Sequence, residues 1–169
     1  NRQSLERLIE RVRRGVPGIA VRTTFITGFP GETEDDFDEL MAFVKNVEFD
    51  RVGVFTYSDE EGTPAFELPN KVPVRTASRR RMALMKEQSR ISRRKNKARV
   101  GDTVRVLFEG ESKESELLWQ GRTETQAPDI DGCVLINDVP DGVLPAPGDF
   151  VNVEITEAHE YDLIGRISV

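Results

Sequence analysis

The spacing of apolar residues changes near Gly101, and this change requires two different folds along the 169 residues. Before it, two segments with apolar residues at helical spacing alternate with two apolar, β-branched runs over residues 19–27 and 51–57. The helical positions are Leu5, Leu8, Ile9 and Val12, followed by Phe37, Leu40, Met41 and Val44. Thr33 and Asp36 are spaced to form a capping box before the second helix. Helix, strand, helix and strand with short links is typical of a parallel α/β sheet.

From Gly101 onward apolar and polar residues alternate, which is the period of a half-buried strand. About five short strands are indicated, separated by turns rich in Gly, Pro and Asp. They lie near residues 104–108, 117–125, 133–136, 151–155 and 163–169. A five-stranded antiparallel barrel of the OB-like kind is the economical fold for about 70 such residues. The expected fold class is therefore α/β followed by all-β.

The first half has too few strands to form a sheet of its own. Parallel sheets are buried on both faces, and two parallel strands supply neither the hydrogen-bond ladder nor the cover for this. We therefore expect the α/β half to be part of a larger α/β protein, with further strands supplied by sequence outside these residues.

Charge divides the chain in a similar way. Residues 1–96 carry 18 Lys and Arg against 15 Asp and Glu, whereas residues 97–169 carry 6 against 15, a net charge of −9. Residues 75–99 hold eleven basic side chains and one acid, Glu87, and residues 74–97 lack Gly and Pro. This stretch predicts a long, mostly exposed basic helix. We expect three parts: residues 1–74, a basic linker helix over 75–97, and an acidic barrel over 98–169.

Composition excludes several classes of protein. One Cys and one His rule out a disulfide framework, a zinc cluster or a three-cysteine iron–sulfur site made by these residues alone. The longest uncharged stretch, residues 23–31, is nine residues, far below the roughly 20 that span a bilayer. The first residues do not resemble a signal peptide. We expect a cytoplasmic protein that does not contact membranes.

Two short motifs follow the two predicted parallel strands. The first, residues 28–32 with the sequence GFPGE, links a strand to a helix. Ligands of α/β folds bind at this edge, where glycines allow close backbone approach and helix N-termini offer free N–H groups. The same residues would equally suit a tight turn that binds nothing. The second motif ends with Tyr57 and Ser58, which could contact a substrate or simply cap the strand.

These motifs and the acidic module together resemble radical SAM methylthiotransferases. The relevant segments are residues 24–34 (TFITGFPGETE) and 55–65 (FTYSDEEGTPA), which resemble the last part of the radical SAM (β/α) barrel. The acidic barrel is similar to the TRAM domain of that family. Residues 121–124 (GRTE), 126–132 (QAPDIDG) and 160–163 (EYDL) are similar to the RimO branch, which modifies an aspartate of ribosomal protein S-twelve.

The resemblance implies a cofactor set and a site. Members of the family use S-adenosylmethionine and two 4Fe–4S clusters, and a methylthio group is attached to the β-carbon of the substrate aspartate. The cysteines that hold both clusters would lie outside these residues, so the chain alone should be inactive. By position, the residues expected near S-adenosylmethionine are Gly28, Gly31, Glu32, Phe55, Tyr57 and Ser58. No catalytic residue and no metal ligand is expected in the chain itself.

Two alternatives stay open at this point. The MiaB branch of the same family modifies an adenosine of tRNA, but a module of net charge −9 would repel tRNA and suits a basic ribosomal protein. We therefore expect the acidic barrel to dock S-twelve in or near the small ribosomal subunit, with tRNA disfavoured. The second alternative is a non-enzymatic RNA-binding adaptor, for which the acidic module offers few aromatic residues and no dense basic surface.

Overall fold

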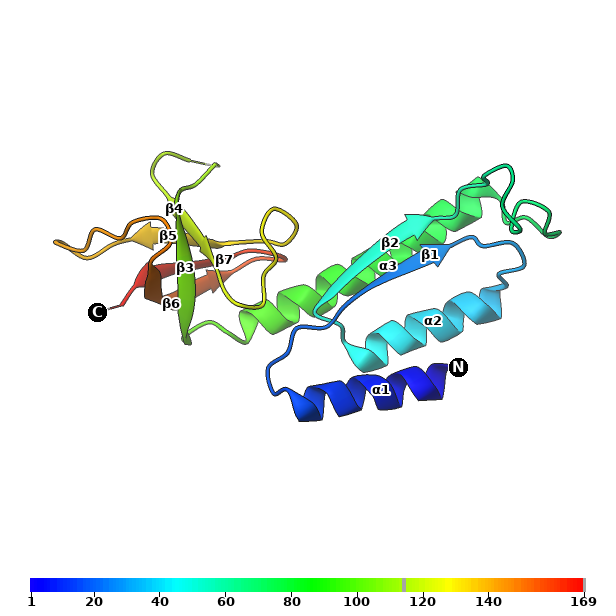
Figure 1. Ribbon diagram of the computed structural model, residues 1–169, viewed down its shortest axis with the longest axis horizontal. Coiled ribbons are helices and arrows are strands. Elements are labelled where there is room, and N and C mark those ends of the chain that lie inside the picture. The colour runs from blue at the N-terminus through cyan, green and yellow to red at the C-terminus, as the bar shows by residue number, and fades with distance from the viewer. Residues whose placement is uncertain (114, 169) are drawn as a thin grey trace. The chain divides into compact units, whose positions relative to one another are not determined.

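The computed structural model describes residues 1–113 and 115–168, which form two compact units, Asn1–Ile91 and Ser92–Val169. Figure 1 labels their helices and strands. In the first unit these are α1 (Arg2–Gly15), β1 (Arg22–Thr27), α2 (Glu34–Val47), β2 (Arg51–Thr56) and α3 (Val74–Lys97), which continues into the second unit. The predicted alternation of helix and strand is confirmed. None of the helices, over the residues described, is long and apolar enough to cross a membrane.

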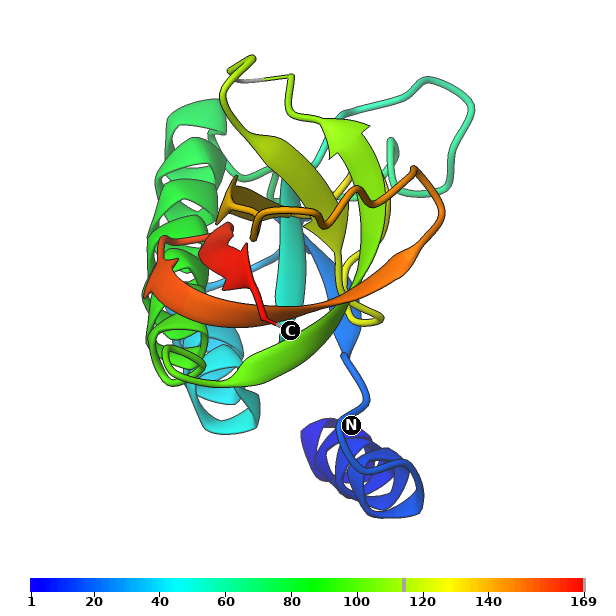
Figure 2. The same cartoon turned by 90° about the vertical axis from the view of Figure 1, so that its left-hand side faces the viewer.

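The two strands of the first unit pair in parallel, with Phe25 of β1 opposite Val54 of β2. Helices α2 and α3 cover one face of this sheet (Figure 1 and Figure 2). On that face lies the core of the first unit, whose buried members are Phe43, Val44, Val47, Phe49, Val52, Val54, Leu84 and Ile91. On the opposite face Ile26 and Phe55 are paired in register and are 55% and 63% exposed. The sheet is thus covered on one face only.

Side chains form hydrogen bonds with the free backbone groups at both ends of α2. The predicted capping box is confirmed: the Asp36 backbone N–H donates to Thr33 Oγ1 at 3.1 Å, and the Thr33 backbone N–H donates to Asp36 Oδ2 at 2.9 Å. At the other end Arg13 of α1 donates to the carbonyl oxygens of Val47 and Glu48 at 2.7 and 3.1 Å. A cationic side chain at a helix C-terminus donates hydrogen bonds to the free carbonyl groups there and interacts favourably with the helix dipole.

Helix α3 differs from the exposed linker that the sequence predicts. Ala77, Leu84 and Ile91, spaced every seven residues, are buried, and the last two are fully so. The Gln88 side chain, also buried, donates to the Phe49 carbonyl oxygen at 3.1 Å. This apolar stripe is narrow and is surrounded by basic residues, so the composition of the segment does not reveal a buried face. The helix is a covering layer of the sheet.

The second unit is a closed barrel of β3 (Thr103–Glu111), β4 (Trp119–Arg122), β5 (Val134–Asp138), β6 (Phe150–Ala158) and β7 (Leu163–Ile167). The strand order is β3-β4-β5-β7-β6, and β6 pairs with β3 to close the ring (Figure 2). Residue 169, expected in the last strand, lies outside the described residues. The five expected strands are confirmed.

The expectation that the barrel is antiparallel throughout is wrong. Strands β5 and β7 run parallel, with Val134 opposite Leu163, while the other four pairs are antiparallel. The reason is geometric: strand direction cannot alternate all the way around a closed ring with an odd number of strands. A five-stranded closed barrel must therefore contain at least one parallel pair, and this barrel is mixed.

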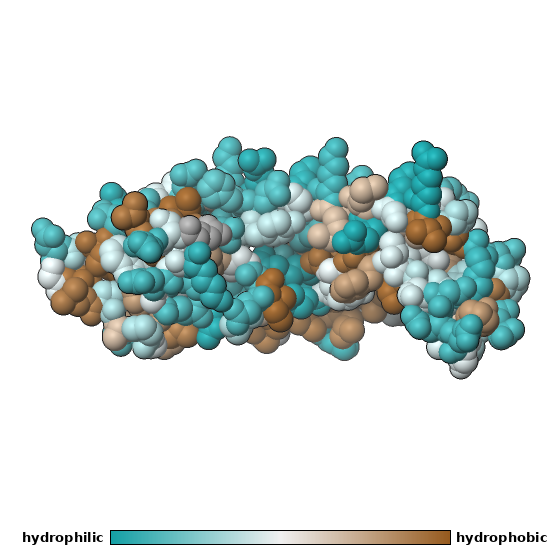
Figure 3. Space-filling model, turned by 90° about the horizontal axis from the view of Figure 1, so that it is seen from above, coloured by the Kyte–Doolittle hydropathy of each residue, from teal (hydrophilic) through white to brown (hydrophobic). Residues whose placement is uncertain are grey.

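Alternate residues of the barrel strands point inward. They form a separate apolar core of Val104, Val106, Phe108, Val134, Ile136, Val153, Ile155, Leu163 and Ile167. Gly121 and Gly165 sit where strands come too close for a side chain: a Cβ on either would lie 2.4 Å from a carbonyl oxygen of the next strand. In the view from above, apolar residues form separate patches between hydrophilic ones (Figure 3).

Candidate functional site

The loop after β1 is held against α3 by close packing. Thr27, which is fully buried, donates its hydroxyl to the Ala77 carbonyl oxygen at 3.1 Å. Gly28 follows with φ +81°, and a Cβ there would lie 2.3 Å from the Ala77 Cβ. Glycine is therefore required at position 28 both by the backbone conformation and by the approach of the helix.

A buried ion pair fixes the same loop. The Glu32 carboxylate accepts the Gly28 backbone N–H at 2.9 Å through one oxygen and Arg80 Nη1 at 2.6 Å through the other. The side chains of Arg80 and Glu32 are only 3% and 12% exposed. Arg80 also donates to the Glu32 carbonyl oxygen at 3.1 Å and pairs with Glu34 at 3.1 Å. Glu32 thus stabilises the loop conformation through its hydrogen bond with Gly28 and its ion pair with Arg80.

Gly31 stands on the exposed side of the loop. Its φ is +87°, a Cβ would meet no atom within 4 Å, and its N–H donates to the Asn70 carbonyl oxygen at 3.0 Å. The backbone conformation, and not a lack of space, therefore favours glycine at this position. The loop consequently has one side packed on α3 and one side open.

The end of β2 lies beside this loop. The Tyr57 N–H donates to the Thr27 carbonyl oxygen at 2.8 Å, and the Tyr57 ring packs edge-on against Phe29 with centroids 5.3 Å apart. The Tyr57 hydroxyl donates to Asp59 at 3.0 Å, and Lys71 also pairs with Asp59. The exposed Ser58 hydroxyl donates to Glu60 at 2.9 Å.

The pKa values of Asp59 and Tyr57 are shifted from their ordinary values. The hydrogen bond from Lys71 lowers the pKa of Asp59, helped by the bond from Tyr57. Desolvation, together with the bond to Asp59, raises the pKa of Tyr57. At neutral pH the edge therefore presents a protonated phenol and an ionised carboxylate.

The structure brings most of the predicted residues together. Gly28, Gly31, Glu32, Tyr57 and Ser58 lie on the two adjacent loops, whereas Phe55 lies on the open face of β2. The structure also places Arg80, Lys71 and Phe29 at these loops, and of these three only Phe29 lies within a motif that the sequence singled out. Arg80 is one of eleven basic residues between positions 75 and 99, and no local pattern distinguishes it from its neighbours.

The two loops bring accessible polar and aromatic groups to one edge of the sheet. The arrangement combines exposed glycine backbone, an aromatic pair and one charged pair at the carboxyl edge of parallel strands, where α/β folds bind their ligands. Within the described residues no group of three or more His, Cys, Asp or Glu side chains is placed to hold a metal ion.

The barrel matches a known domain family. The family model described as the TRAM domain matches residues 100–167. This range covers all five strands of the closed barrel.

Curated relatives match nearly the whole chain. The chain is 52% identical over 159 residues to a protein of Koribacter versatilis named "Ribosomal protein uS12 methylthiotransferase RimO", covering 94% of this chain and 32% of the relative. Proteins with the same name from Solibacter usitatus (52% over 161 residues) and Myxococcus xanthus (51% over 167 residues) are covered to 34% of their length, with 95% and 99% of this chain matched. The chain spans about a third of the length of the curated relatives it matches, and the matched third is their C-terminal region. Nearly the whole chain is thus similar to the C-terminal region of proteins named as RimO methylthiotransferases, and its barrel matches the TRAM domain.

Proposed function

We propose that the chain is the C-terminal part of a radical SAM enzyme that adds a methylthio group to the β-carbon of an aspartate in ribosomal protein uS12. The observation that carries this proposal is the 52% identity to a protein named as a uS12 methylthiotransferase, which extends over 94% of the chain. A ribosomal substrate would place the activity in the cytoplasm, in or near the small ribosomal subunit.

The α/β unit is suited to be the end of the radical SAM barrel. In a (β/α) barrel, helices cover the outside and side chains of the parallel strands fill the inside. Here helices cover one face of β1 and β2, and the opposite face exposes Ile26 and Phe55. Residues 1–74 would form barrel wall together with the helix over 75–97, and residues 98–169 would form the TRAM domain.

The carboxyl edge of these strands is the proposed S-adenosylmethionine site. Gly31, Tyr57 and Ser58 offer accessible groups at the edge, Phe55 offers an aromatic face, and Gly28 and Glu32 shape the loop. Reductive cleavage of S-adenosylmethionine would supply the radical that abstracts hydrogen from the substrate carbon. The 4Fe–4S clusters do not fit these residues, because the sequence has one cysteine, Cys133. Their ligands would belong to the rest of the enzyme.

The acidic barrel is the proposed docking module for uS12. Asp138, Asp141 and Glu160 are exposed, and none forms an ion pair within the part of the chain that is described. With a net charge of −9 over residues 97–169, the domain complements a basic ribosomal protein and disfavours tRNA. The tRNA-modifying MiaB branch is therefore the weaker candidate.

The test compares binding of uS12 and of tRNA by the 169-residue chain at low and physiological salt. A triple variant, Asp138→Asn with Asp141→Asn and Glu160→Gln, removes three negative charges from the barrel. We expect it to weaken uS12 binding at least tenfold. Preferential binding of tRNA would instead assign the chain to the tRNA branch.

A matched control removes the same charge from the other unit. Glu10→Gln, Asp38→Asn and Glu39→Gln are exposed positions on α1 and α2. Because net charge changes equally, this variant should leave uS12 binding nearly unchanged. Equal losses in both triple variants would reduce docking to a general charge effect and overturn the role of the barrel.

A further inference from the structure

Three short segments that resemble the RimO branch in sequence lie together on the barrel. They are residues 121–124 at the end of β4, 126–132 in the loop that follows, and 160–163 at the start of β7. From these segments the proposed function uses only the charge of Glu160. Their hydrogen bonds join them into one structure, the loop of residues 123–133, which connects β4 to β5.

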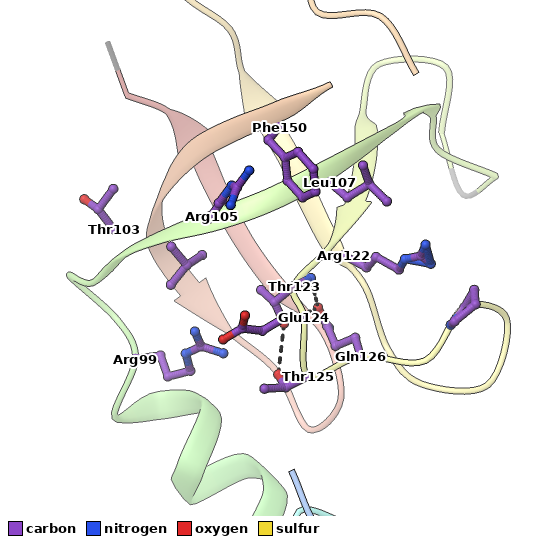
Figure 4. A pocket seen from close by; sticks show the side chains of 12 residues that line it. Arg99, Thr103, Arg105, Leu107, Arg122, Thr123, Glu124, Thr125, Gln126 and Phe150 are labelled. Atoms are coloured by element: carbon purple, nitrogen blue, oxygen red, sulfur yellow. Dashed lines mark hydrogen bonds between the residues drawn. The ribbon is translucent and has the colours of Figure 1, made fainter. Parts of the chain in front are cut away.

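A buried glutamine holds this loop together from inside. Gln126 accepts both the backbone N–H and the hydroxyl of Thr123, at 2.8 and 3.0 Å (Figure 4). Its amide nitrogen donates to the Gly132 carbonyl oxygen at 2.7 Å. Gln126 and Thr123 are both buried. One side chain therefore links the beginning of the loop to its end.

The end of the loop is fastened to the turn between β6 and β7. The Cys133 backbone N–H donates to Asp162 Oδ1 at 2.9 Å. Gly132 packs so closely on this turn that a Cβ there would overlap the Tyr161 carbonyl oxygen. The two ends of the loop are thus fixed by the barrel, and the conformation does not depend on a ligand. Preorganisation of this kind lowers the entropic cost of binding.

The tip of the loop presents an apolar side chain between two acids. Ile130 is 73% exposed and stands between Asp129 and Asp131. Asp131 accepts the Ala127 backbone N–H at 2.8 Å, which closes the tip, and the Asp129 side chain is 84% exposed. A single exposed isoleucine is ordinary on a protein surface. Here, however, a loop with fixed ends holds it out beside a groove.

The groove at the base of the tip is acidic. Its volume is about 340 Å³, and it runs between the loop and the outer side of β3 and β4. Its charged lining residues are Glu109, Asp129, Asp131 and Asp162 with Lys113 and Arg122. Four carboxylates against two cations leave the lining with a net charge of −2. Such a groove favours a cationic side chain from outside.

We propose that this loop is the surface on which the barrel docks a basic segment of its protein substrate. Ile130 would be the apolar anchor, and a lysine or arginine of the segment would enter the groove with its apolar stem against Ile130. The inference rests on the proposed function, because the partner is uS12. A nucleic acid or a second copy of the chain would bring more negative charge to an acidic groove, which is why we favour a basic protein.

The test measures binding of labelled uS12 to the 169-residue chain by fluorescence anisotropy at physiological salt. We expect Ile130→Ser to weaken binding about tenfold or more, since burial of an apolar side chain of this size is worth at least that. Ile130→Leu keeps the apolar group and should bind like the parent chain. The control is Leu144→Ser, in the loop between β5 and β6, where Leu144 is 93% exposed. A neutral side chain affects binding only where it is in contact, so this control should change nothing.

Asp129→Asn tests the charge at the tip separately. Asp129 has φ +59°, a backbone conformation that asparagine tolerates, so the loop should keep its shape. We expect weaker uS12 binding at low salt and a smaller difference at high salt, whereas the loss in Ile130→Ser should be nearly independent of salt. Glu157→Gln on β6 is the matched control, because its side chain is 64% exposed and lies outside the groove lining.

The outcomes separate this inference from the proposed function. If Ile130→Ser binds uS12 as tightly as the parent chain, or if Leu144→Ser loses as much affinity, this surface is wrong while docking by the barrel stands. If the parent chain binds no uS12, docking and surface are both wrong. A change of self-association or of tRNA binding in Ile130→Ser, with uS12 affinity unchanged, would assign the loop to that other partner and overturn the inference. Circular dichroism of each variant establishes that the barrel is folded.

Discussion

The two units differ in whether their strands have unpaired edges. The sheet of the first unit has two parallel strands, and their outer edges are unpaired among the described residues. The barrel of the second unit has five strands and no edge at all, because β6 pairs back onto β3. Closure lets the barrel bury nine apolar residues within itself, whereas the sheet buries apolar residues only on its helix-covered face.

This difference shows the source of structural order in each unit. In the barrel it comes from closure and a shared interior. In the α/β unit structural order comes from both covering helices. Helix α2 supplies Phe43, Val44 and Val47 to the core. Helix α3 supplies Leu84 and Ile91 to the core and Arg80 to the loop after β1. A helix that is basic by composition is therefore one of the two helices that cover this sheet.

The largest expected effect concerns the ion pair between α3 and the loop. Arg80→Ala leaves the Glu32 carboxylate buried without its cation, which costs about 3–5 kcal/mol for a buried pair. We expect the Gly28 amide, which donates to Glu32, to exchange with deuterium much faster in this variant. Amide exchange by mass spectrometry measures the change.

Arg79→Gln is the matched control. Arg79 pairs with Glu34 at the surface, where both side chains are at least 60% exposed, and such pairs contribute about 1 kcal/mol or less. Equal protection of the Gly28 amide in the Arg80→Ala chain and the parent chain would show that α3 does not fix the loop.

A second pair of substitutions compares the two cores directly. Leu84→Ala and Ile136→Ala each remove a fully buried side chain, from the first and the second unit respectively. Each should cost about 2–5 kcal/mol. Because the cores are separate, we expect faster amide exchange only in the unit that carries the substitution. Exchange that accelerates in both units would mean that they unfold together.

A smaller effect is expected from crowding inside the barrel. In Gly165→Ala the new Cβ meets the Glu154 carbonyl oxygen at 2.4 Å, and overpacking of this kind costs about 1–3 kcal/mol. Gly15→Ala serves as control, because a Cβ there meets no atom within 4 Å. Thermal unfolding should show a lower midpoint for the first variant and no loss for the second. Equal midpoints would contradict the close approach of β6 and β7.

The smallest effect is at the start of α2. Thr33→Ala removes the cap and should cost about 1 kcal/mol. The hydrogen bonds from Thr33 lower the pKa of Asp36, so the ionised carboxylate stabilises the fold above its ordinary pKa. This contribution is lost as the pH falls through the lowered folded-state value. In Thr33→Ala the Asp36 pKa should rise toward its ordinary value in an NMR titration. An unchanged pKa would refute the capping box.

Local sequence signals predicted the elements well. The capping box at Thr33 and Asp36, the parallel strands and the five barrel strands all depend on residues close together in the chain. The parallel pair β5–β7 was missed because strand direction depends on how the ring closes. The buried stripe on α3 was missed because three apolar positions stand among many charges.

The candidate site was predicted in part for the same reason. Gly28, Gly31 and Glu32 form one contiguous motif, and their placement after a strand is visible in the sequence. The contact between Glu32 and Arg80 joins positions 48 residues apart and could not be anticipated. A hollow on the outer side of the barrel likewise brings together Arg99, Arg105 and Arg122 from different segments of an acidic domain (Figure 4).

The sequence by itself determined the alternation of helices and strands in the first half and the five short strands of the second half, because periodicity, caps and motifs are local properties of the chain. Only the tertiary structure decided which of the many arginines are buried, which are left without a carboxylate, and which direction the last barrel strand takes. These are relations between distant segments, set by packing and closure, and like charges in the sequence do not distinguish them.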